Sequence, residues 1–343
     1  RDVAPSRGLG DVYKRQGQCV AVDGFRGTVL PEPTPEQTAE FKQRQREYLA
    51  EREALIRYCN LPTVTKNGVK KAVYGNIGKP EDVQAVVQNG GEGIGLFRTE
   101  FLFMDRMSRP TEAEQFEAYA TVAKAMNGRE VIIRTLDIGG DKEIPYLEIE
   151  KEDNPFLGHR AIRYCLDHPD LFCDQIRAIL RAAKFGDLKL MLPLITCKEE
   201  ILAAKKLTQQ CLRELIEAGE DVHPVPVGIM VETPAAALTA AELAKEADFF
   251  SIGTNDLTGY VMAVDRGNQA VARLYDPMQP AVLSAIEMTI KAAKAAGIPV
   301  GMCGEGAADP RLIPHLLAWG LDEFSVSAAS ILKTRKIISE EEA

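Results

Sequence analysis

The residues best placed to do chemistry follow an apolar run near position 250. The run 249–253 stops at the polar triplet Thr254-Asn255-Asp256, and Arg266 follows ten residues after the last of these. A carboxylate can hold a divalent cation, an amide can donate to an oxyanion, and an arginine fork suits phosphate or carboxylate. A strand end, a turn and a capped helix would give the same pattern, so this stretch alone leaves both interpretations open.

Similar residues end several other apolar runs. Four of them are Arg98, Arg134, Glu232 and Cys303. One such arginine is usually a structural ion pair, and one such cysteine is usually a small buried hydrophobe. Because an unpaired buried charge is costly, polar groups at five strand ends are expected to share one site and to neutralise one another and a ligand.

The residue types indicate a small ligand with more than one anionic group. Arg98 and Arg134 offer planar forks for phosphate or carboxylate. Glu232 and Asp256 are the sparse carboxylate pair that Mg²⁺ prefers, with water and substrate oxygens at its other positions. Cys303 lies among glycines, so we expect a reachable thiol, mostly protonated at neutral pH, that acts as a general acid or as a nucleophile.

The elements that must position these residues repeat one unit. Short apolar strands are expected at 69–77, 93–97, 131–137, 188–195, 225–231, 249–253, 299–303 and 323–326. Amphipathic helices are expected at 80–88, 111–126, 159–167, 171–185, 198–218, 235–245, 281–296, 310–318 and 328–338. This alternation predicts an α/β (β/α)₈ TIM barrel with its active site at the carboxyl ends of the strands. An open doubly wound sheet is the alternative, but no glycine-rich nucleotide fingerprint supports it.

Three segments precede the barrel, which is assigned to 63–343. Residues 1–16 have no clear period and are expected to be disordered or non-native. Residues 17–32 resemble the last short strands of an upstream domain. The segment 33–62 is expected to form a linker helix that starts with a Thr-x-x-Gln capping box. Packing of that helix on the outside of the barrel is an equally good interpretation.

Composition limits the class of partner. The 343 residues are 45% hydrophobic and 27% charged, with a net charge of −9, as is ordinary for a globular protein. The acidic balance argues against non-specific binding of nucleic acid or anionic membranes, and no apolar run is long enough to span a bilayer. Seven scattered cysteines and the lack of a signal peptide predict a reduced, cytoplasmic protein.

Six stretches together resemble enzyme I of the bacterial phosphoenolpyruvate:sugar phosphotransferase system, the phosphoenolpyruvate–protein phosphotransferase family. They are GLFRTEFLFMDR (95–106), VIIRTLDIGGDK (131–142), NPFLGHRAIR (154–163), GIMVETPAA (228–236), SIGTNDLTGYVMAVDRGN (251–268) and GMCGEGAADP (301–310). With lesser matches the resemblance extends from Gly17 to the carboxyl terminus. Pyruvate phosphate dikinase and phosphoenolpyruvate synthase share the barrel and several motifs, so a fragment of either is an alternative.

The resemblance implies a role for each residue at the strand ends. The residues that would bind phosphoenolpyruvate are Arg98, Arg134, Arg160, Asn255, Asp256 and Arg266. Glu232 and Asp256 would ligate Mg²⁺. Cys303 would protonate C3 of the enolate that remains after phosphoryl loss, which gives pyruvate. These roles agree with the residue types, because an enolate needs both charge stabilisation and an acid.

Two departures from the family pattern stand out. Gly259 replaces a usual glutamine, which we interpret as tolerated variation. The four histidines, His159, His168, His223 and His315, all lie outside the Thr-Ser-His context of the family's phosphorylated histidine.

We therefore expect the phosphoenolpyruvate-binding half of the enzyme, without the N-terminal phosphohistidine domain. The complete enzyme would pass the phosphoryl group to that histidine and then to a phosphocarrier protein for sugar uptake. This half is expected to form a homodimer and to be unable to complete transfer alone. A non-catalytic phosphoenolpyruvate-sensing dimerisation module is the remaining alternative.

Overall fold

The computed structural model describes residues 19–343 except 25, 105, 140–143 and 148. The chain divides into two compact units, Arg1–Arg57 and Tyr58–Ala343. The expectation of disorder or non-native sequence at 1–16 lies outside the described residues.

The first unit contains a hairpin and one long helix. Strands β1 (Val20–Asp23) and β2 (Thr28–Pro31) are antiparallel, and helix α2 (Pro35–Leu55) follows them. The predicted capping box is present, because the Thr34 hydroxyl accepts from the Gln37 N–H while the Gln37 side chain accepts from the Thr34 N–H. The assignment of this unit to a domain remnant and a linker stays a prediction.

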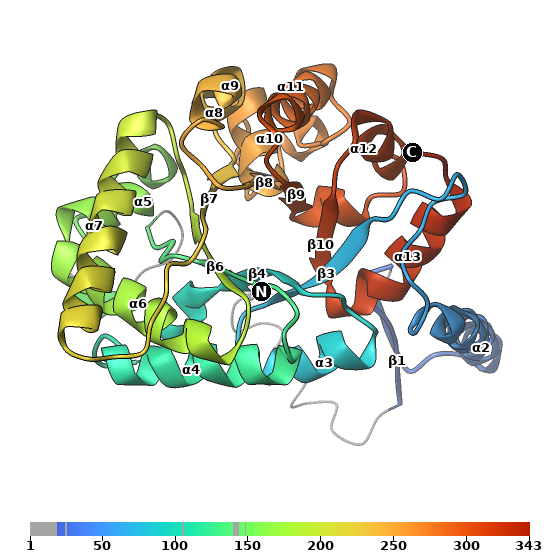
Figure 1. Cartoon of the computed structure of the whole chain (residues 1–343). Helices are drawn as coiled ribbons and strands as arrows, with labels where there is room; N and C mark the ends of the chain where they lie inside the picture. Colours follow the sequence, from blue (N-terminus) through green and yellow to red (C-terminus); the bar gives the residue numbers. More distant parts are fainter. Residues whose placement is uncertain (1–18, 25, 105, 140–143, 148) are drawn as a thin grey trace. The chain divides into compact units, whose positions relative to one another are not determined.

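The second unit is a closed barrel of eight parallel strands (Figure 1). In order around the barrel they are β3 (Ala72–Ile77), β4 (Ile94–Arg98), β5 (Val131–Arg134), β6 (Leu188–Leu192), β7 (Val227–Val231), β8 (Phe250–Gly253), β9 (Val300–Cys303) and β10 (Glu323–Ser327). Strand β10 closes the barrel by pairing with β3, from Glu323 opposite Ala72 to Ser327 opposite Asn76. The predicted (β/α)₈ fold is confirmed, and the open sheet is wrong.

Helices surround the barrel (Figure 1). The α-helices are α3 (Val83–Gln88), α4 (Glu112–Met126), α5 (Ile162–Asp167), α6 (Pro169–Ala182), α7 (Lys198–Glu217), α8 (Pro234–Leu238), α9 (Ala240–Leu243), α10 (Thr254–Met262), α11 (Pro280–Ala296), α12 (Ile313–Trp319) and α13 (Ile331–Glu340). The 3₁₀ turns are η1 (Ile56–Tyr58), η2 (Pro80–Asp82), η3 (Thr99–Leu102), η4 (Pro145–Leu147), η5 (Pro155–Leu157), η6 (Ala183–Phe185), η7 (Ala272–Leu274), η8 (Glu305–Ala308) and η9 (Ala328–Ser330). Across the described residues, every helix is too short or too polar to cross a membrane.

Two boundaries differ from the sequence-based expectation in ways that affect the site. Strand β5 ends at Arg134, three residues early, because the segment up to Asp137 leaves the sheet. Helix α10 begins at Thr254 directly after β8, whereas a loop was expected there. A smaller difference is that the predicted helix 235–245 is two helices, which meet at Thr239.

An apolar layer inside the barrel supports the charged strand ends. Its six residues are Leu96, Ile132, Met191, Met230, Phe249 and Cys303. Alternate strand residues face the same side, so Arg98, Arg134 and Glu232 follow Leu96, Ile132 and Met230 on the interior side of the barrel. The charged groups thus lie one step nearer the carboxyl ends than the apolar layer.

A buried carboxylate lies at the opposite, amino-terminal end of β10. Glu323 is 8% exposed, and its Oε1 has no hydrogen-bond partner among the described residues. Two glycines make room for it, because a Cβ at Gly95 would lie 2.3 Å from Oε1 and a Cβ at Gly301 would lie 1.8 Å from Oε2. Burial, and then the charge of Glu130, raise the pKa of Glu323 well above its ordinary value.

We predict that Glu323→Gln weakens the pH dependence of stability. Because folding raises the pKa of this carboxyl, its favourable contribution is complete below its ordinary pKa of 4.5 and is lost as pH rises. The wild type should therefore lose more thermal stability than the variant between about pH 5 and pH 8.

Thermal midpoints across this pH range provide the measurement. Glu117→Gln, on the exposed surface of α4, serves as the control and should follow the wild type. Parallel curves for Glu323→Gln and the wild type would contradict the assignment.

Candidate active site

Arg134 lies at the centre of the charged strand ends. It is 7% exposed, and its guanidinium forms ion pairs with Glu100 Oε1 at 2.8 Å and with Asp137 Oδ2 at 3.1 Å. Burial alone would lower the pKa of Arg134, but the neighbouring carboxylates raise it above its ordinary value. Its positive charge is therefore permanent.

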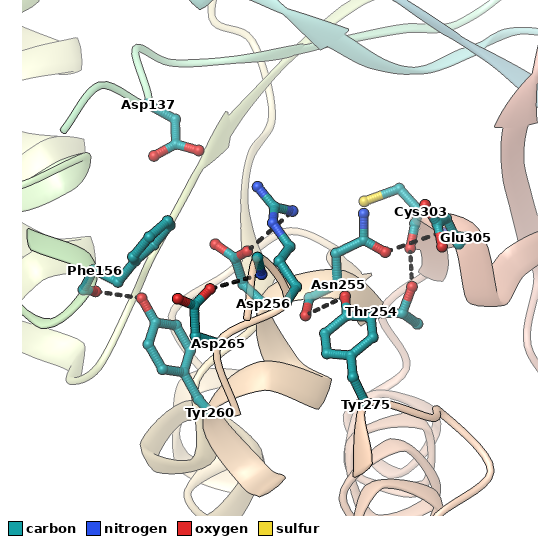
Figure 2. A network of polar contacts seen from close by, with 12 residues as sticks. Asp137, Phe156, Thr254, Asn255, Asp256, Tyr260, Asp265, Tyr275, Cys303 and Glu305 are labelled. Atoms are coloured by element: carbon teal, nitrogen blue, oxygen red, sulfur yellow. Dashed lines mark hydrogen bonds and ion pairs between the residues drawn. The ribbon is translucent and has the colours of Figure 1, made fainter. Parts of the chain in front are cut away.

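Arg160 shares a carboxylate with Arg134. Its Nη2 lies 2.9 Å from Asp137 Oδ1 and 3.2 Å from Asp256 Oδ2, and its Nη1 donates to the Tyr260 hydroxyl at 3.2 Å. Asp137 thus bridges two buried guanidinium groups, and Arg160 connects this bridge to the start of α10. Tyr260 also donates to the Phe156 carbonyl (Figure 2).

Glu232 and Asp256 lie at the ends of the neighbouring strands β7 and β8. Glu232 is 2% exposed, and its Oε1 accepts the Leu194 N–H at 2.7 Å. Burial first, and then the charges of Asp256 and Asp137, raise the pKa of Glu232 to about 8, although Arg134 opposes this effect. Burial and the neighbouring carboxylates therefore disfavour the charged form of Glu232.

Side chains and backbone groups connect the end of β8 to the end of β9 (Figure 2). The Thr254 hydroxyl donates to the Cys303 carbonyl at 2.8 Å, and the Glu305 N–H donates to Asn255 Oδ1 at 3.1 Å. The Tyr275 hydroxyl donates to the Asn255 carbonyl at 2.9 Å. The first turn of α10 is thus fixed in front of Cys303.

Two arginines lie nearer the rim of the site. Arg98 stacks over Phe101, with its guanidinium carbon 4.9 Å from the ring centroid. Arg266 lies in the segment after α10, and its Nη1 is 3.9 Å from Asp256 Oδ1. The rim arginine Arg98 is partly exposed, so it is accessible to a ligand.

Three arginines of the site keep a buried donor without a partner among the described residues. They are Arg98, Arg134 and Arg160, and in each the donor is Nε. Buried N–H groups are almost always satisfied in folded proteins, so an anion or water at these strand ends would complete their hydrogen bonds. Within the described part of the chain, the Nε of Arg335 in α13 is without a partner as well, so the feature is not confined to the site.

The structure corrects the expectation for Cys303. The residue is 3% exposed and belongs to the apolar layer, so its thiol is buried and not reachable from bulk solvent. Burial first, and then the charge of Glu232, raise the pKa of the Cys303 thiol to about 12. The expectation that the thiol is protonated at neutral pH agrees with this direction.

The carboxylates that pair with the site arginines were not among the residues predicted from the sequence. Glu100 and Asp137 are both buried, at 1% and 2% exposure, and both belong to the polar strand ends. Asp137 had a signal, because the buried Arg134 needs a carboxylate and Asp137 follows it by three residues. Glu100 follows Arg98 in the sequence but pairs with Arg134, so its partner could not be read from spacing. Tyr260, which contacts Arg160, had no comparable signal.

Two cavities flank the charged cluster. One, of about 400 Å³, is lined by Asn255, Tyr275, Glu305 and Arg311 among others. The other, of about 260 Å³, is lined by Phe156, Leu194, Thr233 and Tyr260 among others. Neither is lined by Arg98, Arg134 or Arg160, so the orphaned donors and not the cavities mark the anion position.

A family model described as the phosphoenolpyruvate-binding domain of phosphoenolpyruvate-utilising enzymes matches residues 52–343. The chain therefore belongs to the phosphoenolpyruvate-utilising enzymes. It is 50% identical over 326 residues to the phosphoenolpyruvate-protein phosphotransferase of Bacillus subtilis (strain 168). This match covers 95% of this chain and 57% of that protein. It is 51% identical over 333 residues to the phosphoenolpyruvate-protein phosphotransferase of Geobacillus stearothermophilus. This match covers 96% of this chain and 58% of that protein.

The chain thus spans less than two thirds of the length of these relatives. Among solved structures, a citrate lyase from Burkholderia xenovorans LB400 superposes with a TM-score of 0.51 at 20% identity, over 79% of this chain and 78% of that chain. At this identity the likeness concerns the fold alone.

We predict that Glu232→Gln stabilises the metal-free protein. Because folding raises the pKa of Glu232 to about 8, its contribution to stability falls as pH rises from 4.5 towards 8. The amide keeps the acceptor for the Leu194 N–H and removes the charge. The free energy of unfolding at about pH 8 should rise by about 1 kcal/mol or more.

Urea unfolding in the presence of a chelator, at pH 5 and pH 8, measures this change. The gain should be small at the lower pH and larger at the higher pH. A variant that is less stable than the wild type at both values would contradict the assignment.

Proposed function

We propose that this chain binds phosphoenolpyruvate together with Mg²⁺ at the carboxyl ends of its barrel strands, as part of a phosphoenolpyruvate–protein phosphotransferase. The orphaned Nε donors of Arg98, Arg134 and Arg160 support an anionic ligand at this position. The family match and the relatives at about 50% identity support its assignment as phosphoenolpyruvate.

The substrate offers two anionic groups, a phosphate and a carboxylate, and the arginines can divide between them. Arg134 and Arg160 are fixed by buried carboxylates and suit the group that must be held most precisely. Arg98, Arg266 and Asn255 complete the binding set from the rim. Permanently charged, pre-oriented forks are what phosphoryl transfer requires of a protein.

The residues present fit a magnesium ion. The structure contains no cluster of three or more His, Cys, Asp or Glu among its described residues that could hold a metal by itself. Mg²⁺ commonly uses only one or two carboxylates and takes its other ligands from water and substrate. Burial, and then the charges of Asp256 and Asp137, raise the pKa of Glu232, and a cation held by Glu232 and Asp256 would offset this cost of ionisation. When bound, the ion would neutralise negative charge on the phosphate and the enolate.

Cys303 is proposed as the acid that completes the reaction. When the phosphoryl group passes to an acceptor nitrogen, the bond between phosphorus and the enolate oxygen breaks, and its electron pair stays on that oxygen. Carbon C3 then takes the thiol proton, which gives pyruvate and leaves a thiolate that must regain a proton before the next turnover. A thiol with a pKa of about 12 holds its proton at neutral pH until this strongly basic carbon is present.

The acceptor histidine, the phosphocarrier protein, the role in sugar uptake, the homodimer and the cytoplasmic location are part of the same proposal. They rest on the resemblance and on the descriptions of the relatives, which name a phosphoenolpyruvate-protein phosphotransferase. The relatives at 46–51% identity carry that description, which favours it over a dikinase or synthase fragment.

Calorimetric titration of phosphoenolpyruvate tests the site. We predict Mg²⁺-dependent binding, and a Kd at least about 100-fold weaker for Arg134→Ala, because two charge-assisted hydrogen bonds are lost. Arg181→Ala, which removes an arginine that pairs with Glu112 and Glu220, is the matched control and should bind as the wild type does. Binding without Mg²⁺, or unaffected by Arg134→Ala, would refute the proposal.

Exchange at the methyl group of pyruvate tests Cys303. In D₂O with Mg²⁺, the wild type should catalyse deuterium incorporation at C3, because the acid that protonates the enolate also removes that proton in reverse. Cys303→Ala should abolish this exchange and keep the Kd for phosphoenolpyruvate within about twofold. A large loss of affinity with unchanged exchange would make Cys303 a structural residue.

A further inference from the structure

A buried glutamine lies directly behind the anion site. Gln175 belongs to α6 and is 0% exposed. Its Oε1 accepts the Leu136 N–H at 2.8 Å, and its Nε2 donates to the Thr99 hydroxyl at 3.1 Å and to the Tyr119 hydroxyl at 3.0 Å. One side-chain amide on the outside of the barrel therefore contacts the ends of both β4 and β5.

These contacts lead to the site arginines through the backbone. Thr99 directly follows Arg98, and its hydroxyl donates to the Arg134 carbonyl at 2.8 Å. Leu136 lies between Arg134 and Asp137, the carboxylate that bridges two arginines. The amide of Gln175 thus controls the spacing between the two strand ends from which the arginines project.

The segment after β5 needs this support because it has left the sheet. The Thr135 N–H still pairs with the Met191 carbonyl at 2.9 Å, but the next amide, of Leu136, has only a side chain as its acceptor. The Leu136 carbonyl accepts from the Cys165 thiol at 3.6 Å. Side chains of α5 and α6 therefore replace the ladder hydrogen bonds that end at Thr135.

The network continues to α4. The Tyr119 hydroxyl donates to Gln115 Oε1 at 3.1 Å, and Gln115 Nε2 donates to the Pro110 carbonyl at 3.3 Å. Burial raises the pKa of Tyr119, which keeps this hydroxyl a donor. The Gln175 amide makes three of these hydrogen bonds, so removing it leaves several buried polar groups unpaired at once.

We propose that Gln175 is a positioning residue for phosphoenolpyruvate binding, and that it acts by setting the distance between the backbones of Arg98 and Arg134. The inference rests on the proposed function of the site. Gln175 lies behind the strand ends and outside the set of residues that would contact the ligand. Displacement of one arginine by a fraction of an ångström would weaken the hydrogen bonds from its guanidinium group to the ligand. We therefore expect about a tenfold loss of affinity for phosphoenolpyruvate.

Two variants interrupt the network at different points. Gln175→Met keeps the length of the side chain and removes the amide, and Thr99→Val keeps the shape and removes the hydroxyl. Both should raise the Kd for phosphoenolpyruvate by about tenfold in calorimetry with saturating Mg²⁺. Thr99→Ser keeps the hydroxyl and should restore most of the affinity.

A matched control separates positioning from general destabilisation. Thr289 of α11 is also 0% exposed, and its hydroxyl also donates to a carbonyl, that of Ala285 at 2.8 Å. Thr289→Val therefore removes the same group from an equally buried position that is not connected to the site. It should lower the thermal midpoint by an amount similar to Thr99→Val while leaving the Kd unchanged.

The results distinguish a positioning role of Gln175 from a general effect on stability. Weaker binding by Thr99→Val and Gln175→Met, recovery in Thr99→Ser and wild-type binding by Thr289→Val would support the proposal. Equal Kd values for the wild type and Thr99→Val would overturn it, and so would equal losses of affinity in Thr99→Val and Thr289→Val. Both outcomes can be measured even if Gln175→Met does not fold. If the wild type itself does not bind phosphoenolpyruvate, the proposed function is refuted, and this inference with it. That outcome is recognised before any variant is compared.

Discussion

The site depends on one carboxylate that is shared by two buried arginines. Asp137 lies within 3.1 Å of Arg134 and 2.9 Å of Arg160, and all three groups are nearly removed from water. A buried ion pair of this kind contributes little net stability, because desolvation offsets most of the attraction. Its effect is to fix both guanidinium groups before a ligand arrives. Charged groups that the protein already holds in place need little reorganisation when a ligand binds, which is the basis of electrostatic preorganisation.

The barrel makes this arrangement possible by separating its interior into layers. Alternate residues of each strand face inward, so the apolar side chains of Leu96, Ile132 and Met230 lie beneath Arg98, Arg134 and Glu232. Met230, for example, lies below Glu232, and its sulfur is 3.9 Å from Arg134 Nη1. Cys303 belongs to the same apolar layer, yet its pKa responds to Glu232. The proposed acid is therefore both a packing residue and a neighbour of the charged groups, and the two interpretations of a cysteine at a strand end describe one position.

The fold and the polar residues at its strand ends were predictable because they depend on local patterns. Eight apolar runs of strand length define the barrel, and a polar residue just after such a run marks a strand end. Other features depend on packing between distant segments and left no local pattern. Gln175 has the sequence context of an ordinary helix residue, and only the fold brings it to Leu136. The burial of Cys303 and the direct start of α10 after β8 depend likewise on neighbouring strands. Glu100 and Asp137 lie between these cases, since charge balance alone could have identified them.

The space around Glu323 links positions that are far apart in the sequence. Its carboxylate fills the volume that side chains at Gly95 and Gly301 would occupy. A larger residue at 301 is compatible with the fold only if the side chain at 323 becomes shorter, and a shorter side chain at 323 leaves a void that favours a larger residue at 301. At Gly95 a Cβ would also lie 2.6 Å from the Cβ of Ser325, so that position is restricted by Ser325 as well. Positions 301 and 323, which lie on the neighbouring strands β9 and β10, should therefore vary together across the family during evolution.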